Sequence, residues 1–495
     1  MAAHTRTRDR TDAPPTPLAR EFLDLLPADL VITDEVGRRS YECDGLTGFR
    51  QVPALVVLPR DAEEVAAAVR ICARHGVPFV ARGAGTGLSG GALPVADGVV
   101  ISLQKLRRIL EIDVANRRAV LEPGVFNLDI STAAAPHGLY YAPDPSSQQV
   151  CTIGGNVAEN SGGAHCLKYG FTTNHVLSME VVLADGSIVT LGGPTGEQAG
   201  PDLRGVFLGS EGTLGICTKV TVRLLQRAEA KRLVLADFPS VQAAGDTVGD
   251  IVDASIIPAA VEMMDSLAME AAEAAVGAGY TVEAPAALII ELDGPADECA
   301  TQFDALTAIC ERNGATRIHV AETAEEQARV WKGRKAAFAA VGRISPDYIV
   351  QDGVVPRTRL SEVLARIADM GTEVGLRVAN VFHAGDGNLH PLVLYSEAAG
   401  EHDKAEELSS GIAELCVELG GSLSGEHGIG ADKACSMPSM FTDDDLTVMK
   451  RVRTGFDAHG LCNPGKIFPT PRLCGEKPGK YQAHPLEEAG VIERL

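Results

Sequence analysis

The chain has 495 residues, of which 45% are hydrophobic and 22% are charged, which is ordinary for a soluble globular protein. This length accommodates two or three domains and a large core. The formal net charge of −22 argues against nucleic-acid binding and against charge-driven docking on anionic lipid, so an anionic substrate would need a few local cations.

The eleven cysteines are scattered and form no Cys-x-x-Cys pair. We therefore expect neither a disulfide framework nor an iron–sulfur cluster held by this chain, and a reduced cytosolic setting fits. No stretch reaches about 18 uninterrupted apolar residues, the length that a membrane-spanning helix requires. The first seventeen residues mix Arg, Asp, Thr and Pro and are expected to form a disordered tail.

Helices and strands of a mixed α/β protein follow in chain order. Asp61-Ala-Glu-Glu64 resembles a capping box and predicts a helix with an apolar face from Val65 to Cys72 that ends near Gly76. Asp185-Gly186 is a favoured hairpin turn. Strands are expected at 77–81, 98–103, 109–113, 119–121, 180–184, 187–191 and 288–292, and longer helices at 360–374 and 409–419.

Four segments are rich in glycine and small residues. Arg82–Gly91 follows a strand, as a dinucleotide-binding loop would, but no helix is indicated after it and no acidic residue follows at the required distance. Serial glycines still let amide N–H groups converge on a phosphate, although a lone loop of this kind is more often a simple turn. Thr152–Gly163, Leu208–Ile216 and Asn463–Lys466 share this composition. Together the four segments indicate backbone lying along a large, flat, phosphate-bearing cofactor.

Two histidines in the second half have an informative spacing. Residues 378–382 and 389–395 are predicted strands, and Asp386-Gly387 is a favoured two-residue turn between them. In that register His383 faces His390, with the two Cβ atoms roughly 4.5–5.5 Å apart. Two imidazoles held in this way suit a divalent metal, and Glu426 could supply a third ligand. The alternative is a pair of unrelated surface histidines.

These segments resemble those of the vanillyl-alcohol-oxidase type of FAD-binding domain in the FAD-linked oxidase family. The second half, with His383-x6-His390, Ser424–Gly430 and Asn463–Lys466, resembles the D-2-hydroxyacid dehydrogenase branch of glycolate-oxidase type. The likeness runs from about Tyr41 to Phe468. It implies an α+β fold in which an FAD-binding domain of two α/β subdomains is joined to an α+β substrate (cap) domain with an antiparallel sheet.

The charged segment Gln226–Arg232 indicates a domain boundary. The expected organisation is an N-terminal tail and lead-in at 1–40, the FAD-binding domain at 41–227, the substrate domain at 228–440, a C-terminal segment at 441–470 that returns to the FAD domain, and a tail at 471–495.

The resemblance assigns non-covalent FAD to the glycine-rich segments and to Pro143–Ser147, which matches the strip beside the flavin. Arg82–Gly91 contains no histidine for a covalent link, and a thioether to Cys166 is the alternative. Glu211 could be a flavin-side contact or a structural acid. The cofactor-binding residues implied in this way are Arg82, Gly83, Ala84, Gly85, Thr86, Gly87, Leu88, Ser89, Pro143, Asp144, Ser146, Gly154, Gly155, Asn156, Asn160, Ser161, Gly162, Gly163, Glu211, Gly212, Gly215, Ile216 and Asn463.

The resemblance also implies a metal site. His383, His390 and Glu426 match the metal ligands found in several members of the family, and this donor set is compatible with Zn, Mn or Fe. Asp386, between the two histidines, has the plainer role of shaping the turn.

Two further residues receive catalytic roles from the resemblance. His427 matches the base that removes the substrate hydroxyl proton, and Arg334 matches the arginine that binds the substrate carboxylate. A neutral imidazole and a planar guanidinium suit these tasks. The plainer alternatives are a buried, hydrogen-bonded histidine and an exposed helix residue, with Lys335 competing for the role of Arg334.

The implied reaction is the FAD-dependent oxidation of a short 2-hydroxy acid to the 2-oxo acid by hydride transfer to flavin N5. Ser345–Gly353 lacks the second basic residue that relatives acting on dicarboxylates tend to carry, so glycolate or D-lactate is preferred. The alternatives are a D-2-hydroxyglutarate or other D-2-hydroxyacid dehydrogenase acting alone, a metallohydrolase, and a non-catalytic flavoprotein subunit.

The resemblance implies partners for the electrons that leave the flavin. An FAD-domain homologue and an iron–sulfur subunit would receive them and pass them toward quinone. Contact with the membrane would then be indirect, through these subunits, and the chain itself is expected to be cytoplasmic.

Overall fold

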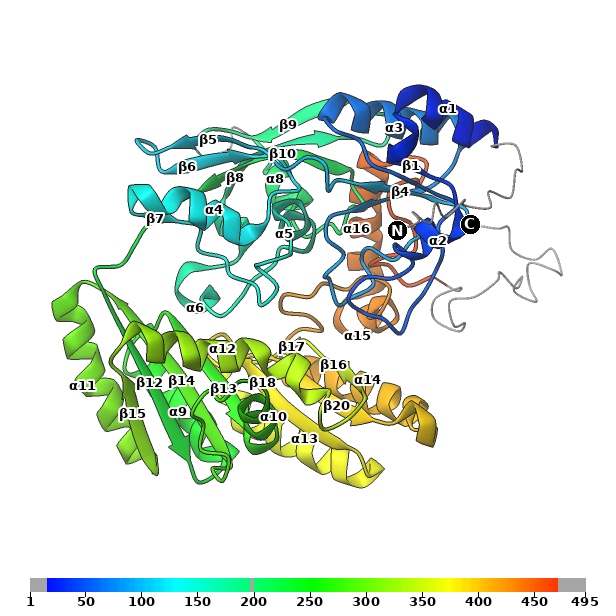
Figure 1. Cartoon of the computed structure of the whole chain (residues 1–495). Coiled ribbons are helices and arrows are strands. Elements are labelled where there is room, and N and C mark those ends of the chain that lie inside the picture. Colours follow the sequence, from blue (N-terminus) through cyan, green and yellow to red (C-terminus); the bar gives the residue numbers. More distant parts are fainter. Residues whose placement is uncertain (1–15, 196–199, 471–495) are drawn as a thin grey trace, which may run out of the picture.

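The structure is a computed structural model that describes residues 16–195 and 200–470. Two bodies lie one above the other (Figure 1): a first body built by residues 16–226 around two main sheets, and a second body built by residues 230–423 around one large sheet. Residues 1–15 of the expected N-terminal tail and the expected tail 471–495 lie outside the described residues. No helix in the described part of the chain is both long and apolar enough to cross a membrane.

The first body begins with a four-stranded sheet of order β1-β2-β4-β3, in which β2, β4 and β3 are parallel. The predicted helix is α3 (Ala62–His75): the Asp61 side chain accepts the Glu64 N–H at its start, and Gly76 adopts φ 60° at its end. The apolar face of α3 packs on this sheet. The other elements here are α1 (Pro17–Leu25), which begins within the expected tail, β1 (Val31–Ile32), α2 (Glu35–Arg39), β2 (Leu55–Val57), β3 (Phe79–Arg82) and β4 (Val99–Ser102).

The second sheet of the first body is antiparallel, with five strands in the order β5-β6-β10-β8-β9. The predicted turn at Asp185-Gly186 joins β8 to β9, with Gly186 at φ 80°. The core between this sheet and its helices contains Ile130 and Ile153. The elements are β5 (Ile109–Asp113), β6 (Arg118–Leu121), α4 (Asn127–Ala134), β7 (Leu139–Tyr140), α5 (Ile153–Glu159), α6 (Cys166–Tyr169), α7 (Thr172–His175), β8 (Val176–Val182), β9 (Ile188–Gly192), α8 (Leu203–Phe207), β10 (Ile216–Arg223) and β11 (Leu225–Gln226), which pairs with β7.

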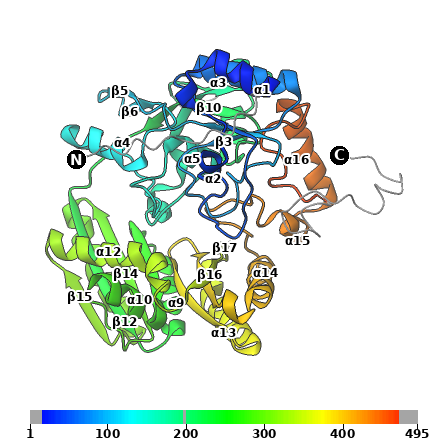
Figure 2. The ribbon, with the colours of Figure 1, turned by 45° about the vertical axis from the view of Figure 1, so that its right-hand side comes forward.

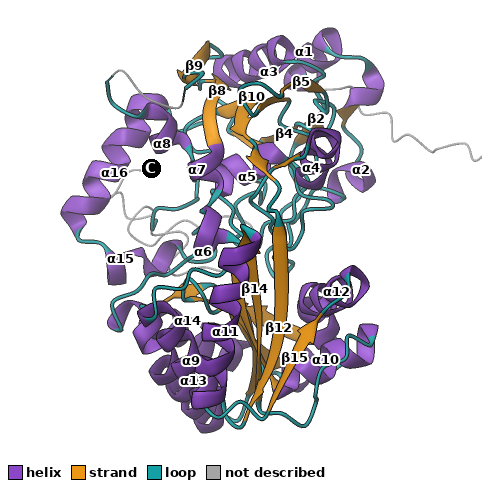
Figure 3. Ribbon diagram, turned by 90° about the vertical axis from the view of Figure 1, so that its left-hand side faces the viewer, coloured by secondary structure: helices purple, strands orange, loops and turns teal. Residues whose placement is uncertain are grey.

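The second body is an antiparallel nine-stranded sheet covered by helices on both faces (Figure 3). Val234 and Leu235 of one strand face opposite cores, so the central strands are buried on both sides. One core includes α9, α11, α13 and α14, and the other α10 and α12. The strands are β12 (Ala230–Phe238), β13 (Ala260–Asp265), β14 (Ala286–Gly294), β15 (Arg317–Ala321), β16 (Asp347–Val350), β17 (Gly353–Val354), β18 (Arg377–His383), β19 (Asn388–Leu389) and β20 (Pro391–Tyr395). The helices are α9 (Val241–Asp253), α10 (Ser266–Val276), α11 (Ala296–Arg312), α12 (Ala324–Val341), α13 (Leu360–Val374) and α14 (His402–Glu418).

The chain then returns to the first body through α15 (Met437–Met440) and α16 (Asp443–Phe456), which lies beside the first body in two views (Figures 1 and 2). The Phe79 N–H donates to Leu461 O at 2.9 Å, and the Asn463 N–H donates to Phe79 O at 2.8 Å. Leu461 and Cys462 are buried in the core of the four-stranded sheet. The glycine loop after β3 and the segment Asn463–Lys466 are therefore neighbours.

Two predictions in the second body need correction. Helix α13 has the predicted bounds, but α14 begins at His402 rather than at Ser409. The hairpin that carries His383 and His390 has a strand register that differs by two residues from the predicted register. His383 pairs with Asn388, and Asn380 pairs with Pro391. A shift by two residues keeps every side chain on the same face of the sheet, so the two histidines still share a face.

Candidate active site

A cavity of about 1330 Å³ lies between the two bodies. Its wall on the first body consists of the glycine loop after β3, the start of α5 and residues 211–217. Its wall on the second body consists of α12, β16 and α14, together with the loop that carries Glu426 and His427. The cavity therefore brings the glycine-rich segments and the histidine loop to one site.

The glycine loop is shaped to admit a large anion. A Cβ on Gly83 would collide with the Thr152 hydroxyl, and Gly85 adopts φ 71°, so side chains are excluded where the backbone meets the cavity. Arg82, which is 7% exposed, lines the cavity, and its Nη1 has no hydrogen-bond partner in the described structure. A buried guanidinium nitrogen without an acceptor, beside a glycine-rich backbone, fits the pyrophosphate of FAD.

Sixteen of the predicted cofactor-binding residues line this cavity, and seven do not. The sixteen are Arg82, Gly83, Ala84, Gly85, Thr86, Gly87, Leu88, Ser146, Gly154, Gly155, Asn156, Ser161, Glu211, Gly212, Gly215 and Ile216. The remaining seven, Ser89, Pro143, Asp144, Asn160, Gly162, Gly163 and Asn463, are not among the residues that line the cavity, but some of them contact residues that do. Asn463, for example, donates to Gly91 O at 2.8 Å and to Glu211 O at 2.5 Å.

Glu211 has a structural role in addition to lining the cavity. Its carboxylate accepts the Ile429 and Gly430 N–H groups, both at 2.7 Å, and so ties the histidine loop to the first body. Burial raises the pKa of Glu211. Burial and the charge of Glu211 also raise the pKa of Glu159, which lines the same wall.

The three predicted metal ligands form one cluster. His383 Nε2 and His390 Nε2 each lie 3.2 Å from Glu426 Oε1, and the two rings lie 5.1 Å apart at nearly a right angle. Burial lowers the pKa of His383, but the charges of Glu262 and Glu426 outweigh it and raise that pKa well above the ordinary value. Two imidazole nitrogens and a carboxylate that converge in this way fit a divalent cation, which would displace the His383 proton.

Glu262 lies behind this cluster and was not anticipated from the sequence. It is fully buried on β13, and its Oε1 lies 2.7 Å from His383 Nδ1. This hydrogen bond directs His383 Nε2 toward Glu426, as carboxylate partners of metal-binding histidines commonly do. A glutamate flanked by apolar residues in β13 was the available signal, but its partner lies 121 residues away.

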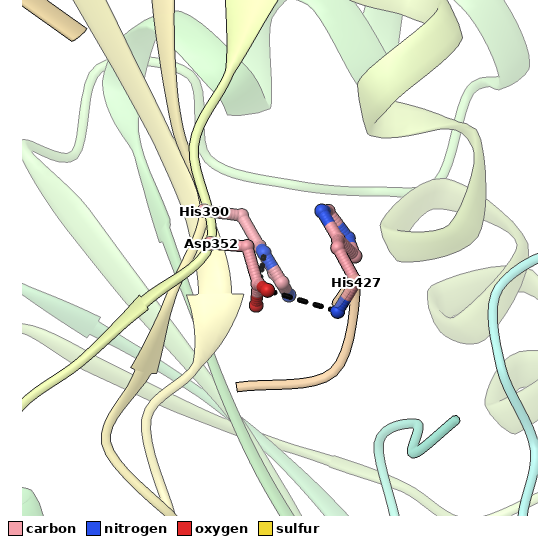
Figure 4. A group of neighbouring side chains, drawn as sticks. All are labelled: Asp352, His390 and His427. Atoms are coloured by element: carbon pink, nitrogen blue, oxygen red, sulfur yellow. Dashed lines mark hydrogen bonds and ion pairs between the residues drawn. The ribbon is translucent and has the colours of Figure 1, made fainter. Parts of the chain in front are cut away.

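His427 lines the cavity, and Figure 4 shows its ring beside that of His390, one of the predicted metal ligands. Its ring stacks on that of His390, with 4.9 Å between centroids and 11° between planes. Burial lowers the pKa of His427 to about 4, with a further contribution from His390. The ring is therefore neutral at physiological pH and able to accept a proton.

The two candidates for binding a carboxylate have different surroundings. Arg334 is 2% exposed, its Nη2 lies 2.5 Å from Glu262 Oε2, and it does not line the cavity. Its Nε has no hydrogen-bond partner within the described ranges, and its guanidinium lies 5.7 Å from the centre of the Phe338 ring, which does line the cavity. Lys335 lines the cavity, with its Nζ 3.7 Å from Asp144. Arg334 is thus not the exposed helix residue of the plainer alternative.

Cys166, the alternative for a covalent flavin link, does not line the large cavity. It lies in a smaller one of about 480 Å³, together with Val355 and Asp386. Asp386 accepts the Asn388 N–H at 3.1 Å, which is the turn-shaping contact considered from the sequence.

Comparisons with known proteins match both halves of the chain. Residues 53–192 match the family model "FAD binding domain", and residues 227–467 match "FAD linked oxidases, C-terminal domain". The chain is 52% identical over 437 residues to the glycolate oxidase subunit GlcD of Escherichia coli (strain K12), which covers 88% of each protein. It is 38% identical to that subunit of Bacillus subtilis (strain 168), over 87% of this chain and 92% of the relative.

A D-lactate dehydrogenase of Archaeoglobus fulgidus is 34% identical, over 83% of this chain and 91% of the relative. Among solved structures, p-cresol methylhydroxylase with substrate bound is 17% identical with a TM-score of 0.77, over 94% of this chain and 97% of the other. The 4-ethylphenol oxidase of Gulosibacter chungangensis is 20% identical with a TM-score of 0.74, over 91% and 97%. These two structures show the fold. From the family models and the close relatives together, the chain belongs to the FAD-linked oxidase family, and FAD is its cofactor.

Proposed function

We propose that this protein oxidises a short 2-hydroxy acid, glycolate or D-lactate, to glyoxylate or pyruvate. The observation that carries the proposal is the position of the His427 ring, which stacks on His390 beside a two-histidine, one-carboxylate cluster at the wall of the cavity that the glycine loop also lines. The names of the relatives agree with this reaction class.

In the proposed reaction, the substrate hydroxyl proton passes to the His427 imidazole and the hydrogen on Cα leaves as hydride. When bound, FAD supplies the hydride acceptor. His383, His390 and Glu426 would hold a divalent cation, which would lower the pKa of the hydroxyl group. Removal of the proton and of the hydride leaves the carbonyl of the 2-oxo acid.

For the substrate carboxylate we propose Arg334, with Lys335 as the competing residue. The free Nε of Arg334 supports the first assignment, because a buried guanidinium N–H without an acceptor is costly in the absence of a ligand. The position of Lys335 in the cavity wall supports the second.

The acidic side chains on the cavity wall of the second body favour a substrate with a single carboxylate. Asp347, Glu397 and Glu406 line the cavity there, and the buried Lys433 has its charge matched by Asp352 at 3.6 Å. A second carboxylate on the substrate would meet acidic groups without a free cation on β16, which makes its burial unfavourable.

We also propose that the protein works as one subunit of a complex, with an FAD-domain homologue and an iron–sulfur subunit as partners. The similarity to the glycolate oxidase subunits of Escherichia coli and Bacillus subtilis supports this. Nine cysteines in the described part of the chain are free and are distributed over both bodies, so they offer no cluster of their own for onward electron transfer.

The experiment that tests the proposed reaction is anaerobic bleaching of the bound flavin by a panel of acids. Glycolate or D-lactate should bleach the absorbance near ~450 nm, while 2-hydroxyglutarate should act more slowly. Protein that carries FAD and is bleached by none of these acids would refute the proposal, and preferential bleaching by 2-hydroxyglutarate would refute the substrate assignment.

A further inference from the structure

Asp352 is a fully buried carboxylate at the centre of the candidate active site, and it has no role in the chemistry proposed so far. It follows β16 and precedes β17, and it is 0% exposed. Figure 4 shows it beside His390 and His427. A buried carboxylate that survives in a core is retained only where its lone pairs are well matched by donors.

The donors to Asp352 come from the loop that carries Glu426 and His427. The carboxylate accepts the N–H groups of Gly425 at 3.1 Å, Glu426 at 3.2 Å and His427 at 2.8 Å. It also accepts the Ser424 hydroxyl at 2.5 Å, and Ser424 Oγ in turn accepts the Gly428 N–H at 2.9 Å. The Asp352 side chain therefore binds the loop directly from residue 424 to residue 427, and Ser424 extends the arrangement to Gly428.

The same carboxylate also faces the His390 ring and the Lys433 ammonium. Its Oδ1 lies 3.8 Å from His390 Nδ1, and its Oδ2 lies 3.6 Å from Lys433 Nζ. Three backbone N–H donors and the Lys433 ammonium suit a carboxylate anion at this position, so the hydrogen bonds of Asp352 to the loop are charge-assisted.

The other polar contacts of this loop include the Ser422 hydroxyl, which donates to Ser424 O at 3.0 Å, and the Glu211 carboxylate, which accepts the Ile429 and Gly430 N–H groups. Gly425 packs against Asn388 so closely that a Cβ would collide with the amide, and Gly428 adopts φ 90°. Glycines lower the intrinsic preference of the backbone for one conformation, so the shape of the loop depends on the bonds that hold it. Glu426 and His427 are consecutive, yet one points to the histidine pair and the other stacks on His390.

We propose that Asp352 is a positioning residue that sets the third metal ligand and the catalytic base at once. By fixing the backbone at Glu426 and His427, it aims the carboxylate at His383 and His390 and holds the imidazole at the cavity wall. This inference rests on the proposed function of His427 and extends it to a residue that touches neither substrate nor cofactor.

Asp352→Asn tests the inference, because the amide keeps the size of the side chain but presents N–H groups to N–H donors. Purified full-length protein loaded with FAD is measured for Zn²⁺ affinity by equilibrium dialysis and for the limiting rate of flavin bleaching by glycolate or D-lactate. We expect FAD content to be unchanged, Zn²⁺ affinity to fall at least about 10-fold, and the limiting rate to fall about 100-fold or more with little change in the substrate concentration at half-saturation.

Asp265→Asn is the matched control. Asp265 is also a buried carboxylate that accepts backbone N–H groups, from Ala268 at 2.9 Å and Asn380 at 2.6 Å, but it does not line the cavity. We expect it to lower the melting temperature while leaving Zn²⁺ affinity and the bleaching rate of the folded protein near the wild-type values. The positioning role would be overturned if the two variants lost the same factor in bleaching rate for the same loss of melting temperature.

Ser424→Ala removes the hydrogen bond from the Ser424 hydroxyl to Asp352. This variant replaces Asp352→Asn in the test if the Asp352→Asn protein does not fold. It should change both readouts in the same direction by a smaller factor. The inference is overturned if the folded Asp352→Asn protein, or Ser424→Ala in its place, keeps the wild-type limiting rate. That outcome leaves the proposed function intact, whereas wild-type protein that no 2-hydroxy acid bleaches would refute the function itself. If the wild-type protein binds no Zn²⁺, the limiting rate of flavin bleaching alone tests the inference.

Discussion

At the scale of single residues, the environment of His427 decides its chemistry. The side chain stacks face to face on a second imidazole and is partly buried, and the loss of solvation lowers its pKa. The sequence identified this residue through resemblance, but its contacts with His390 and Asp352, which lie 37 and 75 residues earlier in the chain, are not encoded by any local pattern. The Glu262 and Asp352 carboxylates beside His383 and His390 escaped prediction for the same reason.

Replacing His427 by Asn should retain FAD and slow flavin bleaching by the substrate about 100-fold or more, because the amide cannot take the hydroxyl proton. Stopped-flow absorbance under anaerobic conditions measures the rate. His319→Asn, on β15 outside the cavity, is the control and should bleach at the wild-type rate. A His427→Asn protein with most of the wild-type rate would show that another group is the base.

The roles of Arg334 and Lys335 can be separated by two substitutions. Arg334→Lys should raise the substrate concentration at half-saturation about 10-fold or more, because the ammonium loses the paired N–H groups that match a carboxylate. Lys335→Met should change it little. Steady-state assays over a range of glycolate concentrations measure both, with circular dichroism as the check on folding. The reverse pattern would transfer carboxylate binding to Lys335.

At the scale of secondary-structure elements, sequence patterns correctly predicted helix ends that are set by neighbouring residues. Asp61 and Gly76 mark the ends of α3, and Gly375 ends α13, because capping groups act within one turn. The hairpin after β18 was predicted two residues out of register, because its turn is shaped by Asp386 and by packing of Gly387 against Val355 rather than by a simple two-residue turn. The prediction that His383 and His390 lie on the same face of the sheet was nevertheless correct.

Gly387→Ala should weaken this hairpin. Gly387 adopts φ 78°, and a Cβ there would collide with Val355 O. Gly400→Ala is the control. Gly400 adopts φ 72° but has open space around it, so this substitution introduces only the backbone strain of about 1–2 kcal/mol and no steric collision. Urea unfolding should show an additional loss of about 1–3 kcal/mol for Gly387→Ala, accompanied by weaker Zn²⁺ binding. Equal stability of the two variants would contradict the close packing of this turn.

At the scale of the whole molecule, the two bodies meet through buried charges near Trp331. His165 Nδ1 of the first body lies 3.0 Å from Asp144, and its Nε2 lies 3.3 Å from Glu291 of the second body. Glu291 also accepts the Trp331 indole N–H at 2.8 Å. The resemblance predicted two domains, but residues 126 positions apart in this junction could not be paired from sequence.

This junction should make stability depend on pH. Burial lowers the pKa of His165, but the charges of Asp144 and Glu291 raise it to about 10. Because the folded pKa exceeds the ordinary value of about 6.5, the stabilisation is complete below pH ~6.5 and is lost as pH rises through about 10.

His165→Gln should therefore cost roughly 3 kcal/mol at pH 6, with the difference from wild type shrinking toward pH 10. Urea unfolding followed by the fluorescence of Trp331, the single tryptophan of the chain, measures it. His75→Gln, which removes a more exposed pair with Glu21, is the control and should cost about 1 kcal/mol or less. A difference for His165→Gln that is constant with pH would show that His165 is not protonated in the folded protein.

The central claim is that the cavity between the bodies brings a 2-hydroxy acid to FAD for removal of its Cα hydrogen. Its most direct test is the anaerobic single-turnover bleaching of the FAD-loaded protein by glycolate or D-lactate carrying deuterium at C2. The account predicts bleaching that is several-fold slower than with the protiated acid. Bleaching at the same rate with either isotope under conditions where chemistry limits the rate, or no bleaching at all, would contradict it.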